Sequence, residues 1–319
     1  MRQGADGDAP GCHGVRVRSE VDLGIGRCRG EPLADVEVQV GPVPPDASTL
    51  IWTLQGRGVE AASQRLYRDV DGHLTIWVND APQLALSADH RVITVDAPVG
   101  AVGAVGAVQA QLVASFGLPL VLDGLPVLIL HGAAAARGDD AIVIVGPTGA
   151  GKSSALVGLV DAGWAAMSED VCVIDLAASP PQVWPGPPWV RRLSGERGPA
   201  TAGRRFRAGP KTAWDLTPWM ATGPKTVAGI FVLDPPVGSE PRRTPLEHSA
   251  VLRALATHAV WLGDPAGRSR ATFAGTAAAA VRIPAAAISF PRTPDWLDQL
   301  AAAVSAEAST TDARPATSG

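Results

Sequence analysis

Apolar and polar residues alternate in several short runs in the first third of the chain, which is the period of a strand that buries one face. The runs cover residues 15–18, 36–40, 74–78 and 92–95. Turn-forming pairs such as Gly41-Pro42 separate them. The pattern predicts a small antiparallel β-rich region over residues 15–100. Residues 1–14 are rich in Gly, Asp and Ala without any period, so we expect them to be disordered.

Later in the chain, strands are predicted by short apolar runs at residues 125–130, 141–145, 171–174 and 227–233. Apolar residues at helical spacing follow Lys152 and stop before Gly163, a residue suited to the position after a helix C-terminus. This order of strands and helices predicts an α/β domain over residues 101–304, and a disordered tail over 305–319.

Three further segments carry helix signals. Residues 97–122 have no charge, but their glycines, prolines and two glutamines favour a buried helix and turn over a membrane span. Thr244-Pro245-Leu246-Glu247 has an N-cap residue, Pro at the first helical position and Glu two positions later, so a helix is predicted to begin there. Thr293-Pro294-Asp295 predicts another helix start.

The stretch between the strand at 141–145 and the helix after it has the sequence Gly146-Pro147-Thr148-Gly149-Ala150-Gly151-Lys152-Ser153. It fits the phosphate-binding P-loop pattern G-x-x-x-x-G-K-[ST]. Strand, glycine-rich loop and helix is the context that this motif requires. The sequence therefore indicates that the chain binds a nucleoside triphosphate.

Each part of the motif has a chemical task. The glycines let backbone N–H groups approach phosphate oxygens, and the helix N-terminus adds partial positive charge. Lys152 is positioned to reach the β- and γ-phosphates, and Ser153 to hold Mg²⁺. We therefore predict ATP and Mg²⁺ as cofactors. The predicted nucleotide-binding residues are Gly146, Pro147, Thr148, Gly149, Ala150, Gly151, Lys152, Ser153 and Ser154.

Composition narrows the function classes. Of the 319 residues, 46% are hydrophobic and 18% charged, and the net charge is −4, which is typical of a globular protein. No basic run interleaved with aromatic residues indicates a nucleic-acid groove. The three cysteines lack metal-ligand spacing and form no disulfide framework, and the N-terminus lacks an apolar signal segment. We expect a cytoplasmic protein without nucleic-acid or membrane partners.

A kinase also needs a metal-holding acid and a base near the γ-phosphate. Glu169-Asp170, Asp175 and Asp234 are the competing acids, since each lies at or near the end of a predicted strand. His131 stands at the end of the predicted strand at 125–130, where a lone histidine is structural more often than catalytic. The Pro- and Gly-rich segment 177–226 is predicted to form long loops. Its basic residues could contact phosphates or lie in solvent; these are Arg191, Arg192, Lys211 and Lys225.

Three blocks together resemble the HPr kinase/phosphorylase family, especially its shorter HPr-kinase-like relatives. They are Leu130-His131-Gly132, the glycine-rich loop at 146–153, and Ser168-Glu169-Asp170 after Gly163-Trp164. The resemblance covers residues 120–176. It implies a P-loop domain of the phosphoenolpyruvate-carboxykinase-like type, often assembled into homo-oligomers.

The resemblance also implies roles. Asp170 would be the general base toward a substrate hydroxyl, His131 would support it, and Glu169 and Ser153 would hold Mg²⁺. The family pair is usually Asp-Asp, and the glycine-rich signature of true HPr kinases is absent here. The resemblance is therefore to kinase-like proteins of peptide natural-product clusters, which implies a serine kinase acting on a protein or peptide.

Other classes fit less well. Leu193-Ser194-Gly195-Glu196 is similar to the signature loop of transporter-type ATPases but follows Lys152 too closely. No Asn-Lys-x-Asp motif indicates a GTPase. A non-catalytic ATP-binding regulatory module stays open, because a P-loop specifies binding and not chemistry.

Overall fold

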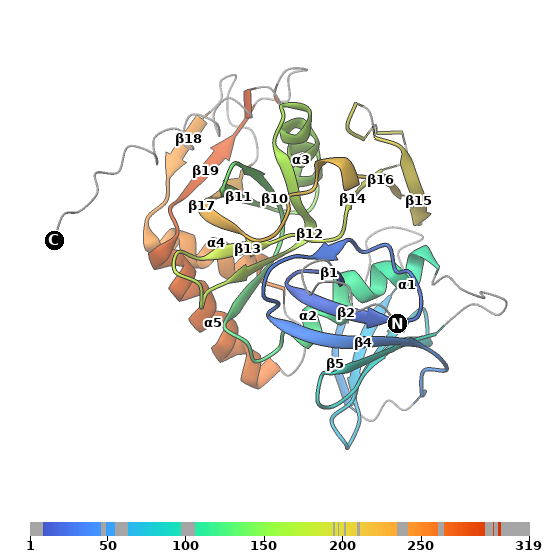
Figure 1. The fold of residues 1–319 in the computed structure, drawn as a ribbon. Helices are drawn as coiled ribbons and strands as arrows, with labels where there is room; N and C mark the ends of the chain where they lie inside the picture. The colour runs from blue at the N-terminus through green and yellow to red at the C-terminus, as the bar shows by residue number, and fades with distance from the viewer. Residues whose placement is uncertain are drawn as a thin grey trace.

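The computed structural model has a mixed α/β fold built on two large sheets (Figure 1). It describes residues 9–45, 49–54, 63–96, 106–193, 195–196, 198–200, 202–208, 211–234, 242–260, 265–290, 296 and 299–300. None of the helices in these parts of the chain is long and apolar enough to span a membrane. The predicted tail at 305–319 and the helix start at Thr293 lie outside the described residues.

The first sheet is larger than predicted and is not purely antiparallel. Its nine strands run in the order β3-β1-β2-β4-β9-β8-β7-β6-β5, and β4 is parallel to both β2 and β9. The expected disorder is wrong for residues 9–14, because β1 and a turn occupy them. The strands are β1 Ala9–Cys12, β2 Val15–Ser19, β3 Arg27–Cys28, β4 Ala34–Val40, β5 Thr49–Leu54, β6 Gln64–Arg68, β7 Leu74–Val78, β8 Ala81–Leu86 and β9 Val92–Val95.

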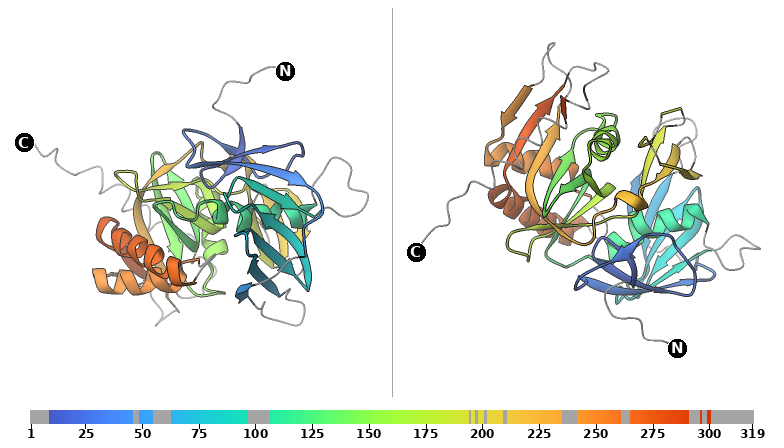
Figure 2. Two further views of the ribbon diagram at one scale, coloured as in Figure 1. Left: turned by 90° about the horizontal axis from the view of Figure 1, so that it is seen from below. Right: turned by 45° about the horizontal axis from the view of Figure 1, so that its top comes forward.

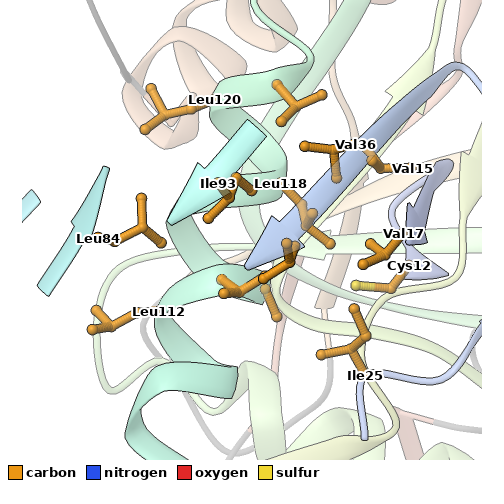
Figure 3. Close-up of a cluster of buried hydrophobic side chains, with 14 of the residues drawn as sticks. Cys12, Val15, Val17, Ile25, Val36, Leu84, Ile93, Leu112, Leu118 and Leu120 are labelled. Carbon is orange, nitrogen blue, oxygen red and sulfur yellow. The ribbon is translucent and has the colours of Figure 1, made fainter. Parts of the chain in front are cut away.

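A short helical segment packs on this sheet. It consists of α1 Ala107–Leu112, the π-turn η1 Val113–Gly117 and α2 Leu118–Val121, and it forms the helix predicted for the uncharged segment. Leu112 and Leu118 join Leu84 and Ile93 in one buried apolar cluster (Figure 3). Because this helix shares a core with the sheet, the predicted boundary between residues 100 and 101 does not separate two packing units.

The second sheet carries the glycine-rich loop. Its order is β11-β10-β12-β13-β17-β19-β18, and β11 also pairs with β17, so five of the strands close a ring. Strands β11, β17 and β19 are mutually parallel, as the α/β prediction requires. The strands are β10 Val127–Arg137, β11 Asp140–Val145, β12 Ala165–Asp175, β13 Gln182–Trp184, β17 Lys225–Leu233, β18 Arg242–Pro245 and β19 Ala285–Ser289.

Helices cover both faces of this sheet, and each face has its own apolar core. Helix α3 Lys152–Asp161 buries Leu156 and Leu159 against one face. Helices α4 His248–His258 and α5 Pro265–Arg282 pack together and bury Val251 and Leu255 against the other face (Figure 2). Helix α3 ends as predicted: Gly163 has a φ of +87°, and its N–H and that of Trp164 bond back to the last turn.

A third, three-stranded sheet lies near the start of α3. Its order is β14-β16-β15, with β14 Trp189–Leu193, β15 Arg204–Ala208 and β16 Lys211–Asp215, and the 3₁₀ turn η2 Thr217–Trp219 follows. This sheet comes from the segment 177–226 that the sequence predicts as long loops. Strand β14 contacts both α3 and β12.

Two local predictions are wrong. Strand β10 continues through His131 to Arg137, so His131 lies inside a strand and not at its end. Thr244 and Pro245 belong to strand β18, and α4 begins at His248 with Glu247 as its N-cap. Residues 242–245 pair with β19 in an antiparallel ladder. This tertiary pairing overrides the local helix signal.

Candidate functional site

The glycine-rich loop joins the end of β11 to the start of α3. Residues 147–149 are exposed, whereas Gly146 is buried against β17, where a side chain would lie 2.9 Å from the carbonyl oxygen of Leu233. Gly151 has a φ of +101° and occupies the N-cap position of α3. The loop thus directs the N-terminus of a ten-residue helix towards solvent, which is the geometry that binds anions.

The Lys152 side chain lies back along this loop. It is 8% exposed, and its Nζ donates to the carbonyl oxygens of Gly146 at 2.9 Å and Pro147 at 3.2 Å. Burial lowers its pKa, and the negative charges of Asp170 and Glu169 oppose that shift. The ammonium group is therefore held beside the loop in the place where the sequence predicts phosphate contacts.

The register of the sheet brings the acidic pair to the same level as the loop. Val145, the last residue of β11, pairs with Gly132 on β10, and Gly132 pairs with Asp170 on β12. A Cβ atom on Gly132 would lie 2.7 Å from the carbonyl oxygen of Ile144. Only glycine therefore allows β11 to approach β10 this closely, and Asp170 comes within two strands of the loop.

Asp170 has an unusual backbone conformation. Successive residues of a regular strand point to opposite faces, but Asp170 has a φ of +74°. The Ser168 hydroxyl donates to the carbonyl oxygen of Val171 and bridges the irregular turn. As a result, the carboxylates of both Glu169 and Asp170 contact the guanidinium of Arg191. Such a conformation costs on the order of 1–3 kcal/mol and occurs most often at functional sites.

Glu169 and Ser153 form one half of the site. The Ser153 hydroxyl donates to Glu169 Oε1 at 2.7 Å. Glu169 is 5% exposed, and its Oε2 has no hydrogen-bond partner among the described residues. Burial, followed by the charge of Asp170, raises the pKa of Glu169. A hydroxyl beside a buried carboxylate with an unsatisfied oxygen is a donor set that fits Mg²⁺.

Asp170 and His131 form the other half. His131 Nδ1 lies 3.0 Å from the carbonyl oxygen of Asp170 and 3.4 Å from its Oδ1. Because a carbonyl only accepts, Nδ1 carries a proton in this contact. Burial lowers the pKa of His131, and the charge of Asp170 opposes that shift. Burial raises the pKa of Asp170, but the charges of Arg191 and His131, with smaller effects from lysines, leave it below its usual value.

The three-stranded sheet supplies three of the four basic residues for which the sequence leaves phosphate contact or solvation open. Arg191, whose side chain is 10% exposed, contacts Asp170 Oδ2, and its Nε lies 3.6 Å from Glu169 Oε2. The next residue, Arg192, donates to the Ser154 hydroxyl at 3.0 Å. Lys211 on β16 is close enough for its charge to affect Asp170 and Lys152.

Two other residues of interest are placed by the register. Lys225 pairs with Asp139 at 2.8 Å, at the end of the sheet away from the loop, so it is not part of the site. At the loop end, Leu130 pairs with Ala259 in an antiparallel bridge, and Val260 N–H donates to Ile129. His258 therefore lies across from His131. Burial lowers the pKa of His258, and the charges of Lys152 and His131 lower it further.

Asp234 also lies near the loop. It follows the last residue of β17, and that strand pairs in parallel with β11 up to Val145. Its side chain is exposed. Asp234 thus flanks the glycine-rich loop from the opposite side to Glu169 and remains an alternative acid.

Comparison with known proteins gives little beyond this geometry. No protein-family model matches the sequence, and no curated protein sequence matches it. Among solved structures, the chain is similar to the Hpr(Ser) kinase/phosphatase from Coxiella burnetii, at 13% identity and a TM-score of 0.31. That match covers 58% of this chain and 98% of the other. At this level the likeness supports no conclusion about activity.

Proposed function

We propose that the protein is an ATP-dependent kinase that transfers the γ-phosphate to a hydroxyl, and that the acceptor is a serine of a protein or peptide. One observation carries the proposal: the loop with Lys152 and Ser153 converges with Glu169, Asp170 and His131 at the N-terminus of α3. Any one of these groups alone would be compatible with a structural role. Their convergence supplies phosphate binding, metal binding and a base together.

The backbone of the loop and the N-terminus of α3 bind the phosphates, and Lys152 neutralises part of their charge. Ser153 and Glu169 would hold Mg²⁺, which offsets the charge that develops on the phosphate oxygens. Asp170 is a carboxylate at neutral pH because its pKa is low. His131 donates to the Asp170 carbonyl and so fixes the backbone that carries this carboxylate.

In the transfer step the acceptor oxygen attacks the γ-phosphorus and a new O–P bond forms. The bond between the γ-phosphorus and the bridging oxygen breaks, and ADP leaves. Asp170 accepts the hydroxyl proton. A weak base suffices here, because catalysis through a loose transition state rests mainly on positioning and electrostatic stabilisation.

The direct test is transfer from γ-labelled ATP to a panel of serine peptides and small alcohols in the presence of Mg²⁺. We expect transfer by wild type, none by Lys152→Ala, and a rate reduced by about 10²- to 10⁴-fold in Asp170→Asn. Asp175→Asn at the far end of β12 is the matched control and should retain transfer. Wild-type ATP binding without transfer to any acceptor would instead support a non-catalytic regulatory module.

A further inference from the structure

We infer that Arg191 is a γ-phosphate clamp that, without nucleotide, spans the two acids in place of the metal. This inference rests on the proposed function and assigns a further substrate-contacting group to the same site. It comes from the position of β14, which lies beside the acid-bearing strand and the start of α3.

The contacts define what Arg191 does without a nucleotide. One guanidinium reaches both carboxylates: Asp170 Oδ2, and Glu169 Oε2 at 3.6 Å. Glu169 Oε2 has no hydrogen-bond partner among the described residues. Two adjacent carboxylates in a buried position are strongly unfavourable without a cation. Arg191 supplies that cation on the side of Glu169 that is not bonded to Ser153.

Metal binding removes the need for this arrangement. A divalent cation on Ser153 and Glu169 neutralises the same carboxylate that Arg191 faces, so the two cations compete for one negative group. The guanidinium is planar and has paired N–H donors that match phosphate oxygens. Once released from Glu169, Arg191 still lies beside Asp170, at the place where the γ-phosphate must meet the base.

Neighbouring contacts hold β14 in place for this task. Arg192 donates to the Ser154 hydroxyl in the first turn of α3 and pairs with Glu196 at 3.0 Å. Arg192 thus contacts the helix that follows the loop, and Arg191 contacts the acids of β12. A small movement of the Arg191 side chain is enough to exchange the acids for a phosphate, because its backbone is anchored beside both.

The first test compares nucleotide affinities. We expect wild type to bind ATP more tightly than ADP in the presence of Mg²⁺. Arg191→Lys keeps the charge without the paired donors, and Arg191→Gln removes the charge. Both should reduce the ATP-over-ADP preference, by about 10- to 100-fold for Arg191→Gln, while ADP affinity stays within about threefold. Arg137→Gln, at the exposed far end of β10, is the matched control and should preserve the preference.

The second test uses Mn²⁺ as the probe without nucleotide, followed by its paramagnetic resonance signal. Removing the competing cation in Arg191→Gln should tighten Mn²⁺ binding by about tenfold, and Glu169→Gln should abolish it. Thermal unfolding checks that each variant is folded. If Arg191→Gln does not fold, Arg191→Lys provides the test.

Each outcome decides a separate point. If wild type binds ATP and transfers phosphate while both Arg191 variants retain the ATP preference, the inference is wrong and the proposed function stands. Mn²⁺ binding that weakens in Arg191→Gln also overturns the inference, since it would make Arg191 a supporting residue and not a competitor. If wild type binds neither nucleotide, both the proposed function and the inference are wrong.

Discussion

The two large sheets use charge in opposite ways. On the nine-stranded sheet, charged residues pair at the surface, as Arg16 does with Asp35, whose side chain is 48% exposed. On the seven-stranded sheet Glu169 is buried and Arg191 contacts both Glu169 and Asp170, while Lys152 is buried at the start of the covering helix α3. Surface pairs contribute little to stability, whereas buried charge is costly and is kept where chemistry uses it. The difference supports the proposed site on the second sheet.

The largest effect is expected at the acid pair. Asn tolerates the left-handed backbone of Asp170, so Asp170→Asn changes the chemistry with little strain. We expect the rate of transfer from γ-labelled ATP to fall by about 10²- to 10⁴-fold, with the melting temperature nearly unchanged. Asp234→Asn is the companion variant and should retain transfer. The reverse ranking would move the base to the carboxyl end of β17.

Substitutions in the core of the nine-stranded sheet should change the stability of the protein and not the proposed phosphate transfer. Leu84 is fully buried in the cluster that joins the sheet to α1 and α2 (Figure 3). Leu84→Ala should lower the free energy of unfolding in urea by about 2–5 kcal/mol. Val70→Ala, at a side chain that is 90% exposed, should change it by less than about 0.5 kcal/mol. Equal effects at both positions would contradict the packing described for this sheet.

One histidine makes the first sheet sensitive to acid. His13 is fully buried in a turn, and burial lowers its pKa to about 4 from 6.5. Between these values the unfolded chain binds the proton more readily, so stability is lost as pH falls from 6.5 to 4. The loss is on the order of 3 kcal/mol. Urea unfolding at pH 7, 5.5 and 4.5 should show a shallower decline for His13→Asn than for wild type. A decline in His13→Asn as steep as in wild type would contradict this account.

The smallest effect is expected at the end of α3. Gly163 has a φ of +87°, and an added Cβ would have no heavy atom within 4 Å. Gly163→Ala should therefore cost only the backbone strain, about 1 kcal/mol in thermal unfolding. Gly203→Ala has equally open surroundings and no positive φ, so it should be neutral or slightly stabilising. Identical melting temperatures for the two variants would argue against the helix end described here.

Short-range features of the fold were predictable from the sequence. The strand before the loop, helix α3 and its glycine end follow from residues within a few positions of one another. The parallel pairings of β4, the continuation of β10 through His131 and the strand at Thr244 depend on partners far along the chain. No local periodicity encodes those partners.

The candidate site divides in the same way. Lys152 and Ser153 belong to a local motif, whereas Glu169, Asp170 and His131 were candidates among others until the order of three blocks singled them out. The contact of Arg191 with the acid pair and the position of His258 beside His131 were not predictable. Arg191 looks like any other arginine of a loop-rich segment, and His258 reaches the site only through a two-residue bridge to β10. The sequence marks Arg191 as a basic residue, but nothing in it indicates that Arg191 lies beside the acid pair.

Gly132 has a consequence for how this site could vary. It lies between Val145, which leads into the loop, and Asp170, and it leaves no room for a side chain beside β11. Gly132 therefore sets the distance between β11, which leads into the glycine-rich loop, and β12, which carries Asp170. Any larger residue would widen that spacing and uncouple the two strands, even with every reactive group intact. The distance between the glycine-rich loop and Asp170 therefore depends on the absence of a Cβ atom at Gly132.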